Sequence, residues 1–282
     1  MRKILTSILF ATLVIFSGCA SKFTSTNGNN TLSGQDISAY LIGEYIDVKN
    51  ASAKLTDAGY EVIATYSPVK KGTTIVFTNQ ALKTQASKPG RSNMAVLRLF
   101  VDDKEKMISI TNPVYFGKAF MQDDYNHKVF NKELKTINKA FVGLKTSVDK
   151  LKFDDLADFH FMMGMPYYNE PDKLAKGTAQ ELLKKASDYK KGKLKIFEIK
   201  LSDNSYLLGY ELGKRTKKFV KKVGRANASI LPWCITIENG TATALNAKYY
   251  IAISYPLFTM SQFMGIATVP DAIKKDLAKA FK

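Results

Sequence analysis

The stretch Arg91-Ser-Asn-Met-Ala-Val-Leu-Arg-Leu-Phe-Val101 returns in altered form as Arg225-Ala-Asn-Ala-Ser-Ile-Leu-Pro-Trp-Cys-Ile235. The likeness continues at the same spacing, because Asn112 of the first copy is matched by Asn246 of the second. Similar segments at a fixed spacing are typical of duplicated structural units. The chain is therefore predicted to contain an internal repeat.

Each copy contains apolar, β-branched runs that are typical of strands. They cover 73–78, 94–101 and 107–111 in the first copy and 194–201, 230–237 and 241–245 in the second. In the second copy Asn239-Gly240 separates the last two runs, and this residue pair is a strong hairpin signal. Both copies are therefore expected to contain antiparallel hairpins.

Helical patterns lie between these runs, over 51–58, 131–144, 178–185, 211–223 and 271–281. Gly59 suits a helix end, and Thr178 with Glu181 has the spacing of a capping box. The segment 211–223 carries six cations beside its apolar residues: Lys214, Arg215, Lys217, Lys218, Lys221 and Lys222.

This mixture of elements predicts an α+β fold. We expect two similar small domains, each an antiparallel sheet with helices packed on it, arranged as a pseudo-dimer. The first should cover 36–165 and the second 174–282. The polar stretch 167–172 between them is the predicted linker.

The second copy also resembles a known bacterial family. Its segments 206–220 and 230–240 look like the family catalogued as domain of unknown function 302, in which a strand, a helix and a Leu-Pro-Cys stretch precede a hairpin. Here Trp233 stands between Pro232 and Cys234, so the motif departs by one position. The resemblance covers the second copy well and the first faintly. It implies a compact α+β domain that is prone to pairing, and it implies no established activity.

The start of the chain carries Arg2 and Lys3, then an apolar run that ends in Ser17-Gly18-Cys19. This layout is that of a secretory signal peptide, and its ending resembles a bacterial lipoprotein lipobox. The resemblance implies that residues 1–18 are removed and that Cys19 is acylated with fatty acids such as palmitate. The polar residues 19–35 are expected to form a flexible tether.

A lipoprotein of this kind is expected in the bacterial cell envelope, in or facing the periplasm. The outer membrane is favoured over the inner one, because Ala20 and Ser21 are not acidic. The formal net charge is +17 and comes almost entirely from lysine. Nucleic acid is not an expected partner, since its readers rely on arginine for bidentate contacts. The charge fits either a solvated lysine-rich surface or attraction to anionic lipid headgroups.

Cys234 is the one candidate for thiol chemistry. Strand alternation puts Trp233 and Cys234 on opposite faces, and the larger Trp233 should be buried. We expect Cys234 to lie inert against the lysine-bearing segment 211–223. The alternative is a reactive thiol whose pKa is lowered by a nearby cation.

A second candidate site contains His160, Met162, Met163 and Met165, because imidazole and thioether ligands suit Cu(I). Core packing, with methionine as a filler, is the favoured interpretation of the same residues. An apolar helical stripe would contain Phe153, Leu156, Phe159, His160 and Met163.

The sequence therefore favours a membrane-anchored envelope lipoprotein with a binding or scaffolding role over an enzyme, and no cofactor is expected. One alternative is a thiol-based redox or small-ligand enzyme centred on Cys234. The other is an envelope copper-handling protein that uses the His160 cluster.

Overall fold

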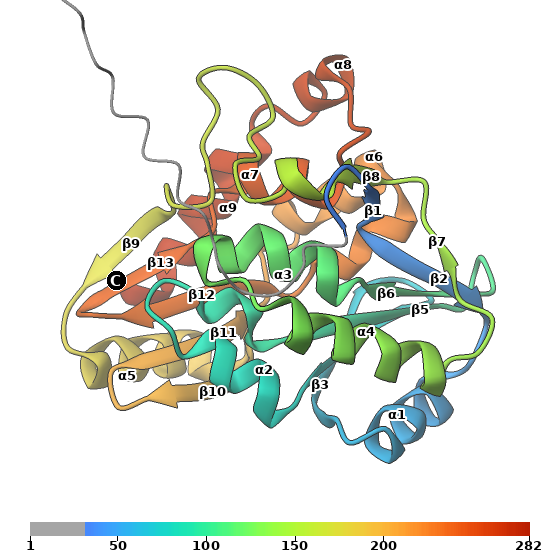
Figure 1. The fold of residues 1–282 in the computed structure, drawn as a ribbon. Coiled ribbons are helices and arrows are strands. Elements are labelled where there is room, and N and C mark those ends of the chain that lie inside the picture. Colours follow the sequence, from blue (N-terminus) through green and yellow to red (C-terminus); the bar gives the residue numbers. More distant parts are fainter. Residues whose placement is uncertain (1–31) are drawn as a thin grey trace, which may run out of the picture.

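The computed structural model describes residues 32–282, apart from the side chains of Asn227 and Ala228. Figure 1 shows a mixed α+β protein in which helices pack on antiparallel sheets. The predicted signal peptide and Cys19 lie outside the described residues. From Leu32 onward, no helix is both long enough and apolar enough to cross a membrane.

The first repeat runs from β2 to α4. Its elements are β2 (Tyr40–Glu44), α1 (Val48–Asp57), β3 (Glu61–Val69), β4 (Gly72–Thr78), α2 (Gln80–Ala86), a 3-10 turn (Ser92–Ala95), β5 (Leu97–Asp102), β6 (Met107–Thr111), α3 (Pro113–Met121), a 3-10 turn (Gln122–Asp124) and α4 (His127–Ala140).

The second repeat runs from β9 to α9. Its elements are β9 (Asp172–Lys176), α5 (Ala179–Asp188), β10 (Lys195–Ser202), β11 (Ser205–Tyr210), a 3-10 turn (Thr216–Phe219), α6 (Val220–Val223), a 3-10 turn (Arg225–Ile230), β12 (Trp233–Glu238), β13 (Thr241–Ala244), α7 (Ala247–Ser254), α8 (Met260–Met264) and α9 (Val269–Ala278).

Short elements lie outside the two repeats. β1 (Asp36–Ser38) precedes the first repeat, and β7 (Lys145–Thr146), β8 (Lys150–Lys152) and a 3-10 turn (Phe153–Asp155) follow it. Strands β1 and β8 pair with each other. This places the first described residues beside the segment that leaves the first repeat.

The two large sheets have the same strand order. One is β3-β4-β5-β6-β2-β7 and the other is β10-β11-β12-β13-β9, and every pairing is antiparallel. Apart from β7, each strand has a counterpart at the same place in the other sheet. The α+β class with two similar antiparallel sheets, expected from the sequence, is therefore confirmed.

The strand register corrects one part of the repeat alignment. Leu97 pairs with Phe77, and Trp233 pairs with Tyr210 at the matching place in the other sheet. Leu97 is therefore equivalent to Trp233 and not to Leu231. Leu231 and Pro232 are an insertion that shifts the second hairpin relative to the first. The turn of the second hairpin is shorter than that of the first, so the two repeats are aligned again before α3 and α7.

The helix that follows each hairpin begins in the same way. Asn112 and Asn246 are the N-caps of α3 and α7, and each side chain accepts a hydrogen bond from the backbone N–H two residues later. Tyr115 and Tyr249, one turn into these helices, are both buried. The Asn and Tyr identities in the repeat thus reflect a shared helix start.

Both repeats contribute to one hydrophobic core. The Tyr115 hydroxyl donates to the backbone oxygen of Ile253 in the other repeat at 2.7 Å. Phe120 and Tyr250 bring their rings to 6.1 Å across the same boundary. The predicted linker takes part as well, because the ring of Tyr168 stacks on Phe120 and is buried.

Several predicted local structures are present. The capping box of Thr178 and Glu181 forms both of its hydrogen bonds. Asn239 and Gly240 have φ values of 48° and 73°, as a type I′ hairpin turn requires. The helices predicted over 131–144 and 271–281 are present with shifted ends, since α4 starts after its cap Asn126 and α9 starts at Val269.

The helix predicted over 211–223 is wrong in its first half. Helical turns begin only at Thr216. The reason is Asp276 of α9, which accepts hydrogen bonds from the Gly213 N–H at 3.0 Å and from the Thr216 hydroxyl at 2.5 Å. This contact from another helix holds the backbone out of a regular helix.

The apolar helical stripe predicted around His160 is also wrong. The chain makes a 3-10 turn at Phe153–Asp155 and then continues as a loop with Gly164 at a φ of 80°. Leu156 is buried, whereas the Met163 side chain is 95% exposed. The pattern of apolar residues resembled a helix, but Gly164 and Pro166 favour irregular backbone.

Candidate functional site

The interface between the repeats is approximately two-fold. Asp102 ends β5 and Glu238 ends β12, and the strand register makes them equivalent. Asp102 contacts Arg225, at the start of a 3-10 turn in the other repeat. Glu238 contacts Gly90, beside the equivalent turn. Such reciprocal contacts are the signature of an isologous interface.

At the Asp102 end of this interface, an arginine side chain fills the space in front of the Asp102 carboxylate. The Arg225 Nε lies 2.8 Å from both carboxylate oxygens of Asp102. The same guanidinium also donates to the backbone oxygen of Lys71. The Asp102 side chain is only 2% exposed. This end of the interface is thus closed by a largely buried ion pair.

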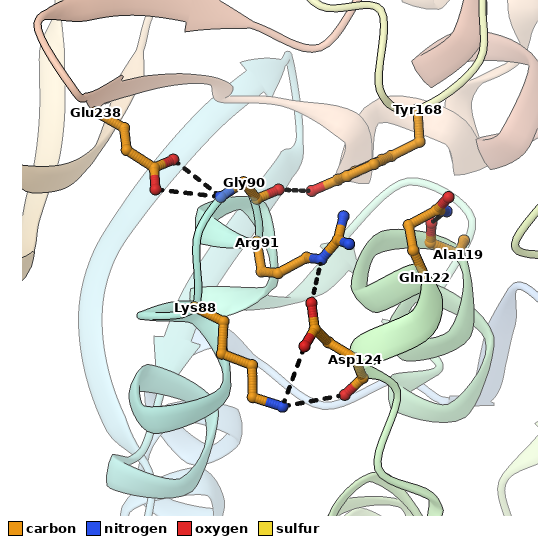
Figure 2. Close-up of polar contacts among 8 residues, drawn as sticks. All are labelled: Lys88, Gly90, Arg91, Ala119, Gln122, Asp124, Tyr168 and Glu238. Carbon is orange, nitrogen blue, oxygen red and sulfur yellow. Dashed lines mark hydrogen bonds and ion pairs between the residues drawn. The ribbon is translucent and has the colours of Figure 1, made fainter. Parts of the chain in front are cut away.

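At the other end the equivalent arginine points elsewhere. Figure 2 shows Arg91 directed at Asp124, with its Nε 2.9 Å from a carboxylate oxygen. Lys88 also reaches Asp124, through the backbone oxygen at 3.3 Å. Glu238 instead accepts two hydrogen bonds of 3.1 Å from the Gly90 N–H. The approximate two-fold symmetry of the interface is therefore broken by the different positions of Arg91 and Arg225.

A cleft of about 290 Å³ opens at this second end. Its lining comes from both repeats and from the segment that joins them: Gly90, Asn93, Tyr168, Asn169, Pro171, Thr236, Glu238, Asn239, Thr241, Thr243 and Leu245. Most of these side chains are polar. One of them, Thr236, is buried, and its hydroxyl has no hydrogen-bond partner within the described part of the chain.

Tyr168 forms one wall of the cleft. Its hydroxyl donates to the backbone oxygen of Gly90 at 2.8 Å, and the Arg91 guanidinium lies 5.8 Å from its ring centroid. Burial raises the pKa of Tyr168 to about 12, against opposing contributions from Asn93 and Arg91. The phenol therefore remains a protonated hydrogen-bond donor at neutral pH.

Cys234 lies at the centre of the interface. It is buried, and its neighbour Trp233 is fully buried in the other core cluster, so the expected alternation is present. The cation beside Cys234 is Arg98 and not the lysine-bearing segment, since an Arg98 amino group lies 3.0 Å from the sulfur. The strand positions of Arg98 and Cys234 are equivalent in the two repeats.

Burial raises the pKa of the Cys234 thiol, and Arg98 opposes this effect only in part. A thiol with a raised pKa is protonated at neutral pH and is a poor nucleophile. A redox role for Cys234 would need a nearby cation, and Arg98 supplies one. The burial of the sulfur argues against such a role.

The His160 cluster lies on the loop between the repeats. The His160 ring is 4.4 Å from the ring of Tyr167, and Met162 is 43% exposed. Met165 is part of a turn in which its N–H donates to the backbone oxygen of Met162. Among the described residues, no group of three or more His, Cys, Asp or Glu side chains is placed to hold a metal ion.

Sequence reasoning identified Arg91, Arg225, Asn93 and Cys234 but missed the residues that make the cleft. Glu238 directly precedes the predicted hairpin turn Asn239-Gly240, and Tyr168 lies in the predicted linker 167–172. A signal for Glu238 was present, since acidic residues end the same strand in both repeats.

No protein-family model, curated protein or solved structure matches the chain. The resemblance to domain of unknown function 302 therefore remains a prediction.

Proposed function

We propose that this protein is a lipid-anchored lipoprotein of the cell envelope that binds a small polar molecule in the cleft between its repeats. The anchoring part rests on the lipobox-like ending at Cys19. The binding part rests on one observation, the open polar cleft beside Glu238. Clefts at the junction of two units are frequent ligand sites.

The lining of the cleft favours binding over catalysis. It offers a carboxylate, hydroxyls and amides, and it includes neither histidine nor cysteine. The thiol at the interface, that of Cys234, is buried and has a raised pKa. Groups of this kind orient a ligand through hydrogen bonds.

Replacing Cys19 by Ala should abolish acylation and with it the lipid anchor. Two or more acyl chains hold a protein stably on a membrane, and the variant would have none. We expect the wild-type protein to sediment almost wholly with membranes and to carry the mass of its acyl groups. The variant should be soluble or remain an unprocessed precursor.

Cys234→Ala is the matched control, because it removes the other cysteine and should leave anchoring intact. Wild-type protein in the soluble fraction without added lipid mass would contradict the proposal.

The exposed cations Lys214, Lys218 and Lys221 should leave the released variant a weak attraction to anionic vesicles. That attraction should vanish as salt rises.

Filling the cleft should remove a bound small molecule. Thr243 lines the cleft and is partly exposed, so Thr243→Trp can occupy the space without entering the core. Native mass spectrometry of protein purified from its own envelope should show an added mass that this variant lacks. Thr56→Trp, on the exposed face of α1, should keep the added mass. The same added mass in both variants would contradict binding in the cleft.

A further inference from the structure

The two ends of the interface differ in what occupies the space before the strand-end carboxylate. We propose that the cleft beside Glu238 binds a small organic cation that carries a guanidinium or a primary ammonium group. The proposal rests on the proposed binding function and names the ligand class.

The Asp102 end of the interface provides the template for this contact. There a guanidinium, that of Arg225, sits on the carboxylate at the end of β5 and also donates to a backbone oxygen. Glu238 occupies the equivalent position at the end of β12. A free guanidinium or ammonium group at this end would therefore make the contact that the protein itself makes at the other.

The absence of an internal arginine from this cleft has a local cause. Asp124 follows α3 and holds Arg91 at 2.9 Å. After α7 the equivalent stretch reads Tyr255-Pro-Leu-Phe258 and contains no acidic residue. Arg225 thus has no competing partner there, whereas Arg91 does. Asp124 keeps the cleft open.

The remaining walls suit a cation with N–H donors. The buried Thr236 hydroxyl has no partner among the described residues, and an oxygen in this position can accept an N–H. Thr241, Thr243 and Asn93 supply further acceptors around it. The cleft volume of about 290 Å³ restricts the ligand to a small molecule.

The test uses the complete mature protein and three probes of similar shape. Methylguanidinium and methylammonium are the cations, and methylurea is the neutral analogue of the first. Titration calorimetry or NMR should show that methylguanidinium binds at least about tenfold more tightly than methylurea, because only the cation pairs with the carboxylate. Equal binding of the two, or no saturable binding at millimolar concentrations, would overturn the proposal.

Glu238→Gln should weaken binding of both cations by about tenfold. Glutamine keeps the length of the side chain and an oxygen for the Gly90 N–H, so the fold should not change. Glu105→Gln removes an exposed carboxylate elsewhere and should have no effect. An unchanged affinity in Glu238→Gln would overturn the proposal.

A second pair of variants tests the role of Asp124. Asp124→Asn should release Arg91, which can then reach Glu238 and compete with the probe, so methylguanidinium binding should weaken. Asp123→Asn removes the same charge one residue away, from an exposed side chain, and should leave binding unchanged. Equal effects of the two variants would mean that net charge alone is responsible, and would overturn the gating by Arg91.

These outcomes separate the ligand class from the proposed function. If Thr243→Trp removes a co-purifying neutral molecule while Glu238→Gln has no effect, the cleft binds a ligand but the cation assignment is wrong. If Thr243→Trp leaves methylguanidinium binding intact, the cation binds elsewhere and the cation assignment is again wrong.

Discussion

Raising the pH from 8 to 11 should remove a large part of the stability of this protein. Burial raises the pKa of Tyr168, Tyr210 and Tyr250 to about 12 in the folded state. In the unfolded chain each tyrosine titrates near its ordinary pKa of about 10. Between these values the unfolded state loses protons that the folded state retains, so the free energy of unfolding falls as the pH rises.

The size of this effect follows from the two pKa values. At pH 11 each tyrosine shifts the equilibrium toward the unfolded state about tenfold, and the three together by roughly 4 kcal/mol. That is a large part of the 5–15 kcal/mol typical of a folded domain. Burial raises the pKa of Tyr40, Tyr60 and Tyr115 still further, and these residues add to the loss.

Urea titrations followed by circular dichroism at pH 8 and pH 11 would measure this change. Tyr168→Phe should reduce the change in unfolding free energy between pH 8 and pH 11 by about one third of the change attributed to the three tyrosines. This expectation holds whatever the substitution does to the stability at pH 8. Tyr167→Phe removes an exposed hydroxyl beside it and is the control. A free energy of unfolding that is equal at the two pH values would contradict the burial of these phenols.

The two equivalent arginines should differ sharply in their contribution to stability. Arg225→Met leaves the carboxylate of Asp102 buried without its cation, and breaking a pair of this kind costs about 3 kcal/mol or more. Methionine retains the apolar stem, so the loss reports mainly on charge. Arg91→Met removes a contact to Asp124, which is 39% exposed, and should cost less than about 1 kcal/mol.

Urea denaturation of both variants would test this difference. Adding Asp102→Asn to Arg225→Met should recover part of the stability, since the unpaired charge is then gone. Asp102 also accepts hydrogen bonds from the N–H groups of Lys104 and Glu105, so recovery should be incomplete. Equal losses in the two arginine variants would show that the interface is more symmetric than its contacts indicate.

Much of the local structure was predictable because its signals are local. The hairpin turn at Asn239-Gly240 needs positive φ values that these residues adopt easily. The cap formed by Thr178 and Glu181 depends only on residues within one turn of helix. Predictions failed where a distant residue intervened. The segment 211–223 is an example, because Asp276 binds Gly213 and Thr216 from another helix.

The candidate site shows the same division. Sequence comparison within the chain paired Arg91 with Arg225, and this pairing places both at equivalent ends of the interface. It did not show that Arg91 turns to Asp124, because the two side chains meet only after α3 packs on the sheet. It also aligned Leu97 with Leu231, since the compensating insertion at Leu231-Pro232 is visible only in the strand register.

By itself, the sequence determined the α+β class, the internal repeat and the alternation that separates Trp233 from Cys234. These depend on periodicity and turn chemistry, which act over a few residues. Only the tertiary structure decided that the repeats share one core and that Arg98 lies beside Cys234. It also decided that the Glu238 end of the interface has an open cleft, whereas the Asp102 end is filled by Arg225. Such contacts join residues more than a hundred positions apart, and packing selects among partners that the chain order leaves open.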